Sequence, residues 1–326
     1  MEKGQLIFFI YFLAIANIVT IKAQQDRAEL LDIAHWRIIY QMDMQTRKNG
    51  QPFTVTDIMA LNIGQTWSVF YNPYRQMRDS LDRVRRDETL PGPVRVDMRP
   101  GNELHARLRF GDVVVDTMCN RRNGETALIF KNRLRNEILT VDNVSLRDPT
   151  ERTRFRFTEH IPPQKWAIVG DTLTVLGYMS YKATTSFRGR NYTAWFTPDI
   201  PINEGPFKFY GLPGLILKIK SDDGVFSFQA IGLEHIPNIP IEIATGFYTH
   251  FRDGSRFWHN WHFIDGNLAQ WQANRKQHFG TVLLGFLDEV DRDDESWFRL
   301  GVNSRHFVSY FATQNPIEFV EIEIIE

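Results

Sequence analysis

The histidines near the C-terminus come closest, by residue type and spacing, to a site for chemistry. His259 and His262 stand in the sequence WHNWH at positions i and i+3, which share one face of a helix. Imidazole nitrogens at this spacing can bind zinc, with His250 or His278 as a third ligand. An aromatic-rich helix with hydrogen-bonded histidines explains the same residues more simply, because no H-E-x-x-H motif supplies a general base. A metal-assisted hydrolase that uses His259 and His262 is therefore an alternative prediction.

Other catalytic signatures are missing from the sequence. Cys119 is the single cysteine, so no internal disulfide is expected, and no neighbouring motif marks it as a nucleophile. The chain contains neither the G-x-S-x-G turn of serine hydrolases nor a G-x-G-x-x-G dinucleotide loop. The paired carboxylates of Asp222 and Asp223 lie in a predicted turn, where solvation explains them. We therefore predict no catalytic residue and no cofactor.

The elements that position these side chains are mostly strands. Alternating apolar and polar residues predict strands over 34–46 and 53–71, the second with a bend at Gly64. More strands follow between 105 and 146. After Pro240 the apolar spacing becomes helical and predicts helices over 256–265, 267–279 and 281–290. The expected fold class is mainly β (α+β), with curved antiparallel sheets and a few helices, mostly in the C-terminal third.

The strongest strand pattern covers residues 166–233. The sequence from Arg188 to Asn191 predicts a hairpin turn with a positive φ angle at Gly189 or Asn191. Gly177 interrupts a predicted strand, which indicates a bulge or close packing. Strand alternation places two sets of side chains on shared faces: Tyr181, Ala183, Thr185 and Phe187 on one strand, and Tyr192, Ala194 and Phe196 on the next.

The sequence GPFKFYGLPGLILKIKSDDG, residues 205–224, fits either a loop that holds a ligand or a corner between strands. Proline at 213 fixes φ near about −65°, and Gly214 can adopt a positive φ angle, which together predict a type II turn. A strand pattern follows this turn, whereas a phosphate-binding loop leads into a helix and contains more glycine. We therefore predict a structural corner that leads into a β-hairpin.

The same block resembles the GLPGLI family of exported proteins, also called Porph_ging. The resemblance depends on an intact hexapeptide, GLPGLI, formed by Gly211, Leu212, Pro213, Gly214, Leu215 and Ile216. It also depends on flanking residues that match: Trp195, Thr197, Pro201, Gly205 and Pro206. Ser180 stands where relatives often have cysteine. The resemblance implies export, a β-rich fold and a role in the cell envelope of Bacteroidetes, and it brings no catalytic residues. By analogy, the sheet is expected to be similar to the half-barrel of lipoprotein carriers.

The first residues predict export. Lys3 precedes an apolar run from Leu6 to Ile21, and Ala23 offers a small residue for cleavage, which is typical of a secretory signal peptide over residues 1–23. The run is short for a membrane span of about 20 residues. Residues 24–326 are expected to form a single β-rich domain that is periplasmic or associated with the outer membrane. Contact with a membrane is expected only through export or peripheral binding.

Composition narrows the class of partner. A formal net charge of −1 argues against nucleic-acid binding, which requires a basic surface. Aromatic residues make up 13% of the chain and favour strands with large side chains. The leading hypothesis is an exported, non-catalytic cell-envelope protein that binds an apolar ligand or an envelope protein partner on a concave β surface. A structural accessory of an outer-membrane receptor system is a further alternative.

Overall fold

The chain of 326 residues is mainly β, as the sequence predicts. The computed structural model describes residues 28–48, 50–73, 94–98, 104–110, 113–118, 127–142, 153–250 and 256–275. The predicted signal peptide, Cys119, His278 and the helix expected over 281–290 lie outside these residues. No helix among the described residues combines the length and the apolar character needed to cross a membrane.

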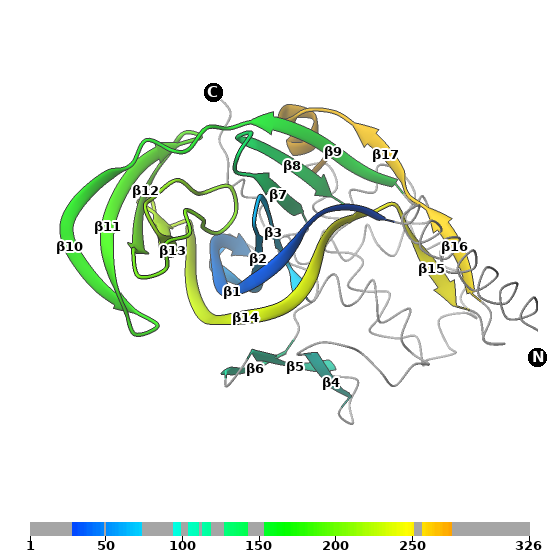
Figure 1. The fold of residues 1–326 in the computed structure, drawn as a ribbon, viewed down its shortest axis with the longest axis horizontal. Coiled ribbons are helices and arrows are strands. Elements are labelled where there is room, and N and C mark those ends of the chain that lie inside the picture. The colour runs from blue at the N-terminus through cyan, green and yellow to red at the C-terminus, as the bar shows by residue number, and fades with distance from the viewer. Residues whose placement is uncertain are drawn as a thin grey trace, which may run out of the picture.

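One sheet of 12 strands contains most of the described residues (Figure 1). Its order is β10 (Ala167–Val175), β11 (Tyr178–Phe187), β12 (Arg190–Thr197), β13 (Leu215–Ser221), β14 (Phe226–Ala244), β1 (Ala28–Lys48), β2 (Gln51–Gly64), β3 (Trp67–Tyr71), β7 (Leu128–Asn132), β8 (Glu137–Asp142), β9 (Thr153–His160) and β17 (His262–Asp265). Neighbours in this sheet are antiparallel except β9 and β17, which are parallel. Because β10 and β17 lie at opposite ends of the order, the sheet is open. The curved antiparallel sheet is confirmed, and the half-barrel is not.

Two smaller sheets are also described. Strands β4 (Val94–Met98), β5 (Leu104–Phe110) and β6 (Val113–Met118) form one of them, and β15 (Gly246–His250) pairs with β16 (Arg256–Asn260) in the other.

The longest strands, β1 and β14, lie at the centre of the large sheet. They pair along nearly their whole length, and the register shifts between Leu30 and Asp32, between Ala34 and Trp36, and between Ile39 and Tyr40. Extra residues at such shifts bend a strand and increase its twist. The shifts account for the strong curvature of β1 and β14 in Figure 1.

Side chains alternate between two apolar clusters along the central strands. Ile38 and Tyr40 of β1 belong to the larger cluster, whereas Ile39 between them belongs to the smaller one. In β2, Met59 and Ala60 divide in the same way. Successive side chains of a strand point to opposite faces, so the centre of the sheet is buried on both faces.

The hairpin of β11 and β12 confirms the predicted faces. Ala183 pairs with Ala194, and Thr185 pairs with Tyr192, which brings the two predicted sets of side chains together. The positive φ angles fall at Arg188 (48°) and Gly189 (70°), and not at Asn191.

The bulge or close packing predicted at Gly177 is wrong, because this glycine forms a hairpin turn and no described atom lies within 4 Å of its Cβ position. Leu176 and Gly177 connect β10 to β11 with φ angles of 51° and 81°. Two successive positive φ angles are characteristic of a type I′ turn, which suits a two-residue hairpin connection.

The helix predicted over residues 256–265 is also wrong. This segment forms β16, which pairs with β15, and β17, which pairs with β9. Spacing at i, i+3 cannot by itself separate helix from strand in so short an aromatic segment, and aromatic residues favour strands once a partner strand is available. A helix is found at 268–275, where Leu268 and the fully buried Trp271 face the core.

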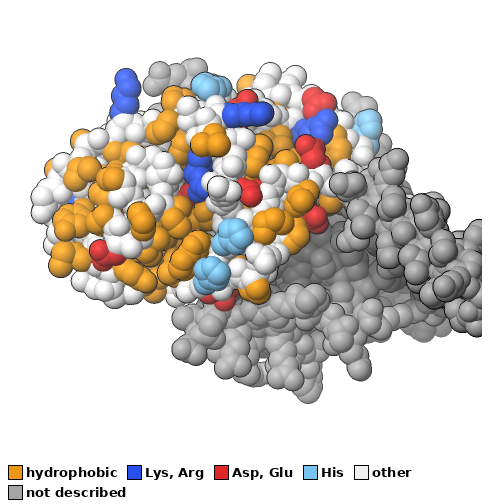
Figure 2. Space-filling view, in the orientation of Figure 1, with side chains coloured by type: hydrophobic (Ala, Val, Ile, Leu, Met, Phe, Trp, Pro, Cys, Tyr) orange, Lys and Arg blue, Asp and Glu red, His pale blue; other side chains and the backbone are white. Residues whose placement is uncertain are grey.

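Large apolar side chains are exposed around the sheet edge at β10. They are Ile168, Val169, Leu173, Leu176, Met179 and Tyr181. In Figure 2, hydrophobic side chains gather at the end of the molecule where Figure 1 shows β10 and β11. The pairing with β11 skips Gly170 and Asp171, and Asp171 Oδ2 lies 2.8 Å from Lys182 Nζ. A bulge and a charge on an edge strand both oppose pairing with another chain.

Candidate functional site

The segment between β12 and β13 is built from tight turns. The N–H groups of Ile202, Glu204 and Gly214 donate to the carbonyl oxygens of Ile200, Ile202 and Leu212, at 2.7, 2.8 and 2.8 Å. Hydrogen bonds between residues i+2 and i define γ-turns. The type II turn predicted at Pro213 and Gly214 is therefore wrong. The chain bends more sharply, with Pro213 at the centre of a γ-turn, as its fixed φ angle permits.

The glycines of the hexapeptide are required by the backbone. Gly214 has a φ angle of 151°, and a Cβ atom there would lie 2.1 Å from the carbonyl oxygen of Thr197. Gly211 has a φ angle of 97°, and a Cβ atom would lie 2.5 Å from Cβ of Pro163. Side chains at these positions would collide with the neighbouring chain, so the motif allows β12, β13 and residues 161–166 to approach closely.

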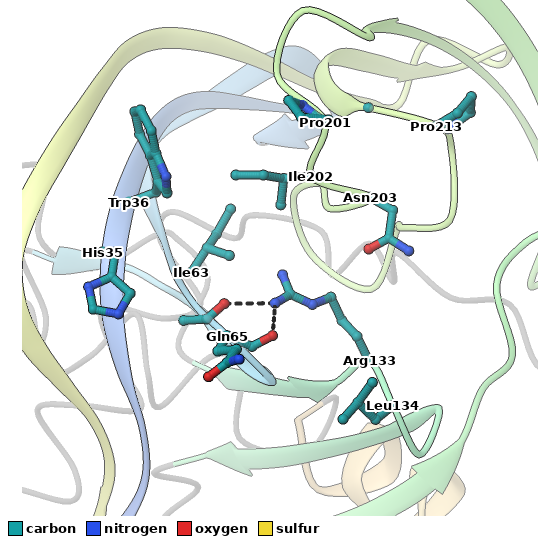
Figure 3. Close-up of a pocket in the computed structure, with 12 residues that line it drawn as sticks. His35, Trp36, Ile63, Gln65, Arg133, Leu134, Pro201, Ile202, Asn203 and Pro213 are labelled. Atoms are coloured by element: carbon teal, nitrogen blue, oxygen red, sulfur yellow. Dashed lines mark hydrogen bonds between the residues drawn. The ribbon is translucent and has the colours of Figure 1, made fainter.

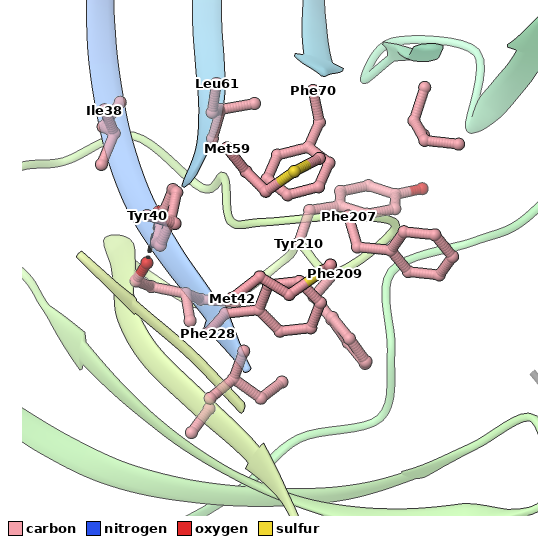
Figure 4. Close-up of a cluster of buried hydrophobic side chains, with 14 of the residues drawn as sticks. Ile38, Tyr40, Met42, Met59, Leu61, Phe70, Phe207, Phe209, Tyr210 and Phe228 are labelled. Carbon is pink, nitrogen blue, oxygen red and sulfur yellow. Dashed lines mark hydrogen bonds between the residues drawn. The ribbon is translucent and has the colours of Figure 1, made fainter. Parts of the chain in front are cut away.

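Residues 204–212 then fill the face of the sheet that carries the larger cluster. Phe207, Phe209, Tyr210 and Leu212 are all at most 2% exposed. Figure 4 shows the aromatic side chains of this segment among those of the strands. The ring centroids of Phe209 and Tyr192 are 4.7 Å apart. Much of the concave surface expected to bind an apolar ligand is thus occupied by the protein's own side chains.

Two buried lysines fasten this segment to the sheet. Lys131 of β7 places Nζ 2.6 Å from Glu204 Oε2 and donates to the carbonyl oxygen of Gly205, also at 2.6 Å. Lys208, which is fully buried, places Nζ 2.6 Å from Glu159 Oε2 of β9. Ion pairs in such surroundings need additional hydrogen bonds to offset desolvation, and Lys131 has them.

The charge of Glu204 affects its surroundings. Burial lowers the pKa of Lys131, although Glu204 opposes this shift. Burial, together with the charge of Glu204, raises the pKa of Tyr40 well above its usual value and that of Tyr210 to about 12. The hydroxyl of Tyr40 donates to the carbonyl oxygen of Ile216 at 2.7 Å. These tyrosines therefore act as neutral hydrogen-bond donors that hold the corner.

A cavity of about 800 Å³ opens beside the corner (Figure 3). Its lining comes from β1, from the end of β2, from the turns after β2 and β7, and from the segment between β12 and β13: His35, Trp36, Ile63, Gly64, Gln65, Arg133, Leu134, Pro201, Ile202, Asn203, Pro213 and Gly214. Six of these residues are apolar, and four carry polar side chains. The volume lies within the range of small-molecule sites.

Arg133 reaches into the cavity from the turn after β7. Its Nη2 atom donates to the carbonyl oxygens of Gly64 and Gln65, at 2.7 Å each. Figure 3 shows these bonds and the guanidinium group among the lining residues. Nη1 is shielded from solvent and has no hydrogen-bond partner among the described residues. The side chain is thus held in place by Nη2, and Nη1 has no acceptor in the described part of the chain.

Asp32 fixes the turn that Arg133 contacts. Its Oδ2 atom accepts hydrogen bonds from the N–H groups of Thr66 and Trp67, at 2.6 and 2.8 Å, and Oδ1 accepts one from Ile33 at 2.7 Å. Burial raises the pKa of Asp32, but these bonds and the charge of Arg133 outweigh it and lower the pKa overall. The ionised carboxylate therefore fixes one wall of the cavity.

The described lining residues can bind a ligand but offer little for catalysis. They include no carboxylate, hydroxyl, thiol or amine side chain, and His35 is the lining residue that could exchange a proton. A covalent mechanism requires a nucleophile next to a base, and general acid–base catalysis usually pairs two such groups. The chemistry available at this wall is stacking, apolar contact and hydrogen bonding.

The histidines proposed as metal ligands are not brought together by a helix. His259 lies in β16, opposite Phe247 of β15, and His262 begins β17 with an exposed side chain. His250 ends β15. In the part of the chain that the structure describes, no group of three or more His, Cys, Asp or Glu residues could hold a metal ion.

The residues that carry the family resemblance lie in several different environments. Pro201, Pro213 and Gly214 line the cavity, and Leu212, Leu215 and Ile216 lie in the core. Thr197, Gly205 and Pro206 are buried, and Gly211 is half-buried. Trp195 is half-buried beneath the amino groups of Lys218 and Lys220, which lie 5.7 and 5.9 Å from its ring centroid. Ser180, at the position where relatives often have cysteine, is fully buried in β11.

The sequence patterns missed the residues that make the cavity and its support. Trp36, Arg133 and Asn203 come from three distant segments, and no local spacing connects them. Lys131 did carry a signal, because it is a charge inside the otherwise apolar strand sequence LIFKN. A charge at a buried strand position implies a buried partner, which here is Glu204.

Comparisons with known proteins agree with the resemblance noted from the hexapeptide. A family model described as "Protein of unknown function (Porph_ging)" matches residues 182–218, from β11 to β13, which confirms that resemblance over this block. No curated protein matches.

Two structures of PNGF-II, in space groups P21 and C2, are similar to the chain with TM-scores of 0.41 and 0.40 at 14% sequence identity. The matches cover 74% of this chain and 33% and 32% of PNGF-II. The chain thus spans about a third of the length of these structures.

Proposed function

We propose that this chain is a non-catalytic binding protein whose small organic ligand occupies the cavity beside the GLPGLI corner. The observation that carries this proposal is the cavity itself, with a volume of about 800 Å³, six apolar lining residues and four polar side chains. Small-molecule sites have about 300–1,000 Å³ and a few polar groups that orient the ligand. The absence of carboxylate, hydroxyl and thiol groups from the described lining favours binding over turnover.

The walls of the cavity are held by interactions that do not depend on a ligand. Gly214 packs against the backbone of Thr197. Arg133 is fixed by two carbonyl oxygens, and the segment that carries Asn203 is anchored by the ion pair of Lys131 with Glu204. A site formed before binding loses less conformational entropy when the ligand enters. This arrangement supports a role in holding a ligand.

The proposed setting is the cell envelope. The proposal follows from the signal-peptide pattern of residues 1–23 and places the protein in the periplasm or at the outer membrane. Mass spectrometry of the protein recovered from envelope fractions tests it, and the expected N-terminus is Gln24. Recovery of the intact N-terminus from the cytoplasmic fraction would contradict the proposal.

Binding can be tested with the neutral apolar dye N-phenyl-1-naphthylamine. Its fluorescence is expected to rise and saturate at one dye molecule per chain. Leu134→Trp adds bulk at the wall of the cavity and is expected to weaken dye binding about tenfold or more, because the space for the ligand is reduced. Leu30→Trp is the matched control, since Leu30 is also exposed and does not line the cavity. Equal binding by the two variants, or no saturable binding by the unaltered protein, would refute the proposed site.

A further inference from the structure

We infer that the end of the β10–β11 hairpin, residues 172–181, binds to the surface of a neutral phospholipid bilayer. None of these residues lines the cavity, so the inference goes beyond the proposed function and does not depend on ligand binding. The cell-envelope setting proposed above would place a bilayer within reach of the protein.

The end of this hairpin is both exposed and uncharged. Its exposed apolar side chains, between 38% and 56% exposed, are those of Leu173, Leu176, Met179 and Tyr181. The sequence between Asp171 and Lys182 contains no charged residue, although charged residues make up 24% of the chain. The uncharged run over residues 58–73, by contrast, is mostly buried. Exposed apolar side chains gathered in this way mark a surface that contacts a partner.

The turn at the tip does not explain why Leu176 is a leucine. Its φ angle of 51° places it at the first central position of the type I′ turn that Gly177 completes, where asparagine is preferred and a leucine is strained. Its side chain is 41% exposed and belongs to neither of the two apolar clusters. Because neither the backbone nor the core accounts for this residue, its strained conformation points to a function outside the fold.

A second protein chain fits this hairpin end less well than a lipid surface does. A stable protein interface needs about 20–30 residues on each side, more than residues 172–181 provide. Addition of a strand to β10 is opposed by the bulge at Gly170 and Asp171 and by the ion pair of Asp171 with Lys182. In Figure 2, hydrophobic side chains gather at this end of the molecule, where Figure 1 shows β10 and β11. A bilayer requires neither a free edge nor a complementary shape.

The charges and the backbone of the hairpin define how it meets a bilayer. Asp171 and Lys182 lie 2.8 Å apart and neutralise each other, so the hairpin end has no net charge that would select anionic lipids. Tyrosine side chains such as Tyr181 favour the boundary between head groups and acyl chains. The outer edge of β10 has no strand partner in the described sheet, and its backbone groups need water. Binding is therefore shallow, at the level of the head groups, and independent of charge.

Co-sedimentation with vesicles of dioleoylphosphatidylcholine tests the inference. The protein is used in its expected mature form, which begins at Gln24, because the apolar run from Leu6 to Ile21 would itself bind lipid. The unaltered protein is expected to sediment with the vesicles to the same extent in about 0.05 M and about 0.5 M sodium chloride, since salt screens only charge interactions. No co-sedimentation, or binding that falls as salt is added, would overturn the inference.

Leu176→Asn separates lipid binding from stability. Asparagine followed by glycine is the preferred pair in a type I′ turn, so this variant is expected to keep or raise the melting temperature while it weakens vesicle binding about fivefold or more. Leu30→Asn is the matched control, because Leu30 is 59% exposed on β1, outside the hairpin, and it is expected to bind vesicles as the unaltered protein does. Equal vesicle binding by Leu176→Asn and the unaltered protein would show that another surface contacts the lipid.

Met179→Thr is a second variant of the same surface, and threonine retains the preference of this position for a strand. It is also expected to weaken vesicle binding about fivefold. Sedimentation velocity without vesicles detects the case in which a second copy of the chain covers the hairpin. A dimer of the unaltered protein that dissociates in both Leu176→Asn and Met179→Thr would overturn the inference in favour of self-association.

Discussion

Lys131 Nζ lies 2.6 Å from Glu204 Oε2, and both side chains are at most 2% exposed. This ion pair connects β7 to the segment that precedes the hexapeptide. One oxygen of Glu204 is bound by the ammonium group, whereas Oε1 has no hydrogen-bond partner among the described residues. The pair therefore determines where the segment lies, at a considerable cost in desolvation.

Lys131→Met is expected to destabilise the protein by about 3–5 kcal/mol, because it leaves Glu204 buried without a counter-charge. The double variant Lys131→Met, Glu204→Gln removes both charges and is expected to recover at least half of this loss. Urea denaturation at neutral pH measures both. A loss below about 1 kcal/mol in the single variant would show that Glu204 is neutral or hydrated.

Gly214→Ala is expected to destabilise the protein by about 3 kcal/mol or more, or to prevent folding. The added methyl group would meet the carbonyl oxygen of Thr197 at 2.1 Å, and backbone cannot move aside cheaply. Gly224→Ala is the control. Gly224 also has a positive φ angle, of 74°, but nothing lies within 4 Å of its Cβ position, so the loss should be about 1–2 kcal/mol. Equal melting temperatures for the two variants would contradict the steric explanation.

Asp32→Asn is expected to lower stability at neutral pH by about 1–2 kcal/mol, because three backbone N–H groups lose a charged acceptor. The folded state lowers the pKa of Asp32 below its usual 3.8. Its stabilising contribution is therefore complete above about pH 4 and is lost as the pH falls through the folded-state pKa. Denaturation of both proteins between pH 7 and pH 2 should show the stability difference narrowing below about pH 4. A difference that stays constant over this range would exclude the charge of Asp32 as the cause.

Asp171→Val is expected to increase self-association. Asp171 is bulged out of the edge strand β10 and paired with Lys182, while Ile168, Val169 and Leu173 are exposed nearby. Removal of the charge would leave an apolar edge without protection. Sedimentation velocity over a range of concentrations measures the effect. Lys220→Val serves as a control, because it removes an exposed charge from β13, which has neighbours on both sides. Similar association of both variants would point to general loss of solubility.

The strands and their faces could be predicted because alternation at period two records which side of a sheet is buried. Ala183 and Ala194 pair as expected, and the chain bends after Gly64 as expected, since β2 ends there and β3 begins at Trp67. The segment with His259 and His262 was misassigned because its structure depends on β15 and β9, and that information is not local.

The corner could be predicted from neighbouring residues, whereas the cavity could not, because distant segments of the chain form it. Proline and glycine at 213 and 214 predict a turn, but its type depends on the close approach of Thr197. The cavity combines side chains as distant in sequence as Trp36 and Pro213. The sequence therefore indicates that the corner is structured, and only the assembled sheet shows that Pro213 and Gly214 also line the cavity.

The pairing of β1 with β14 also constrains when the protein can fold. Arg37 and Glu234, which lie 3.3 Å apart in the central ladder, are separated by 197 positions in the chain. Contacts between residues so distant in sequence slow folding, because a long loop must close before the contacts form. The β1–β14 ladder therefore cannot form until residues beyond 230 have been synthesised, whereas β1 and β2 can pair as soon as both have left the ribosome.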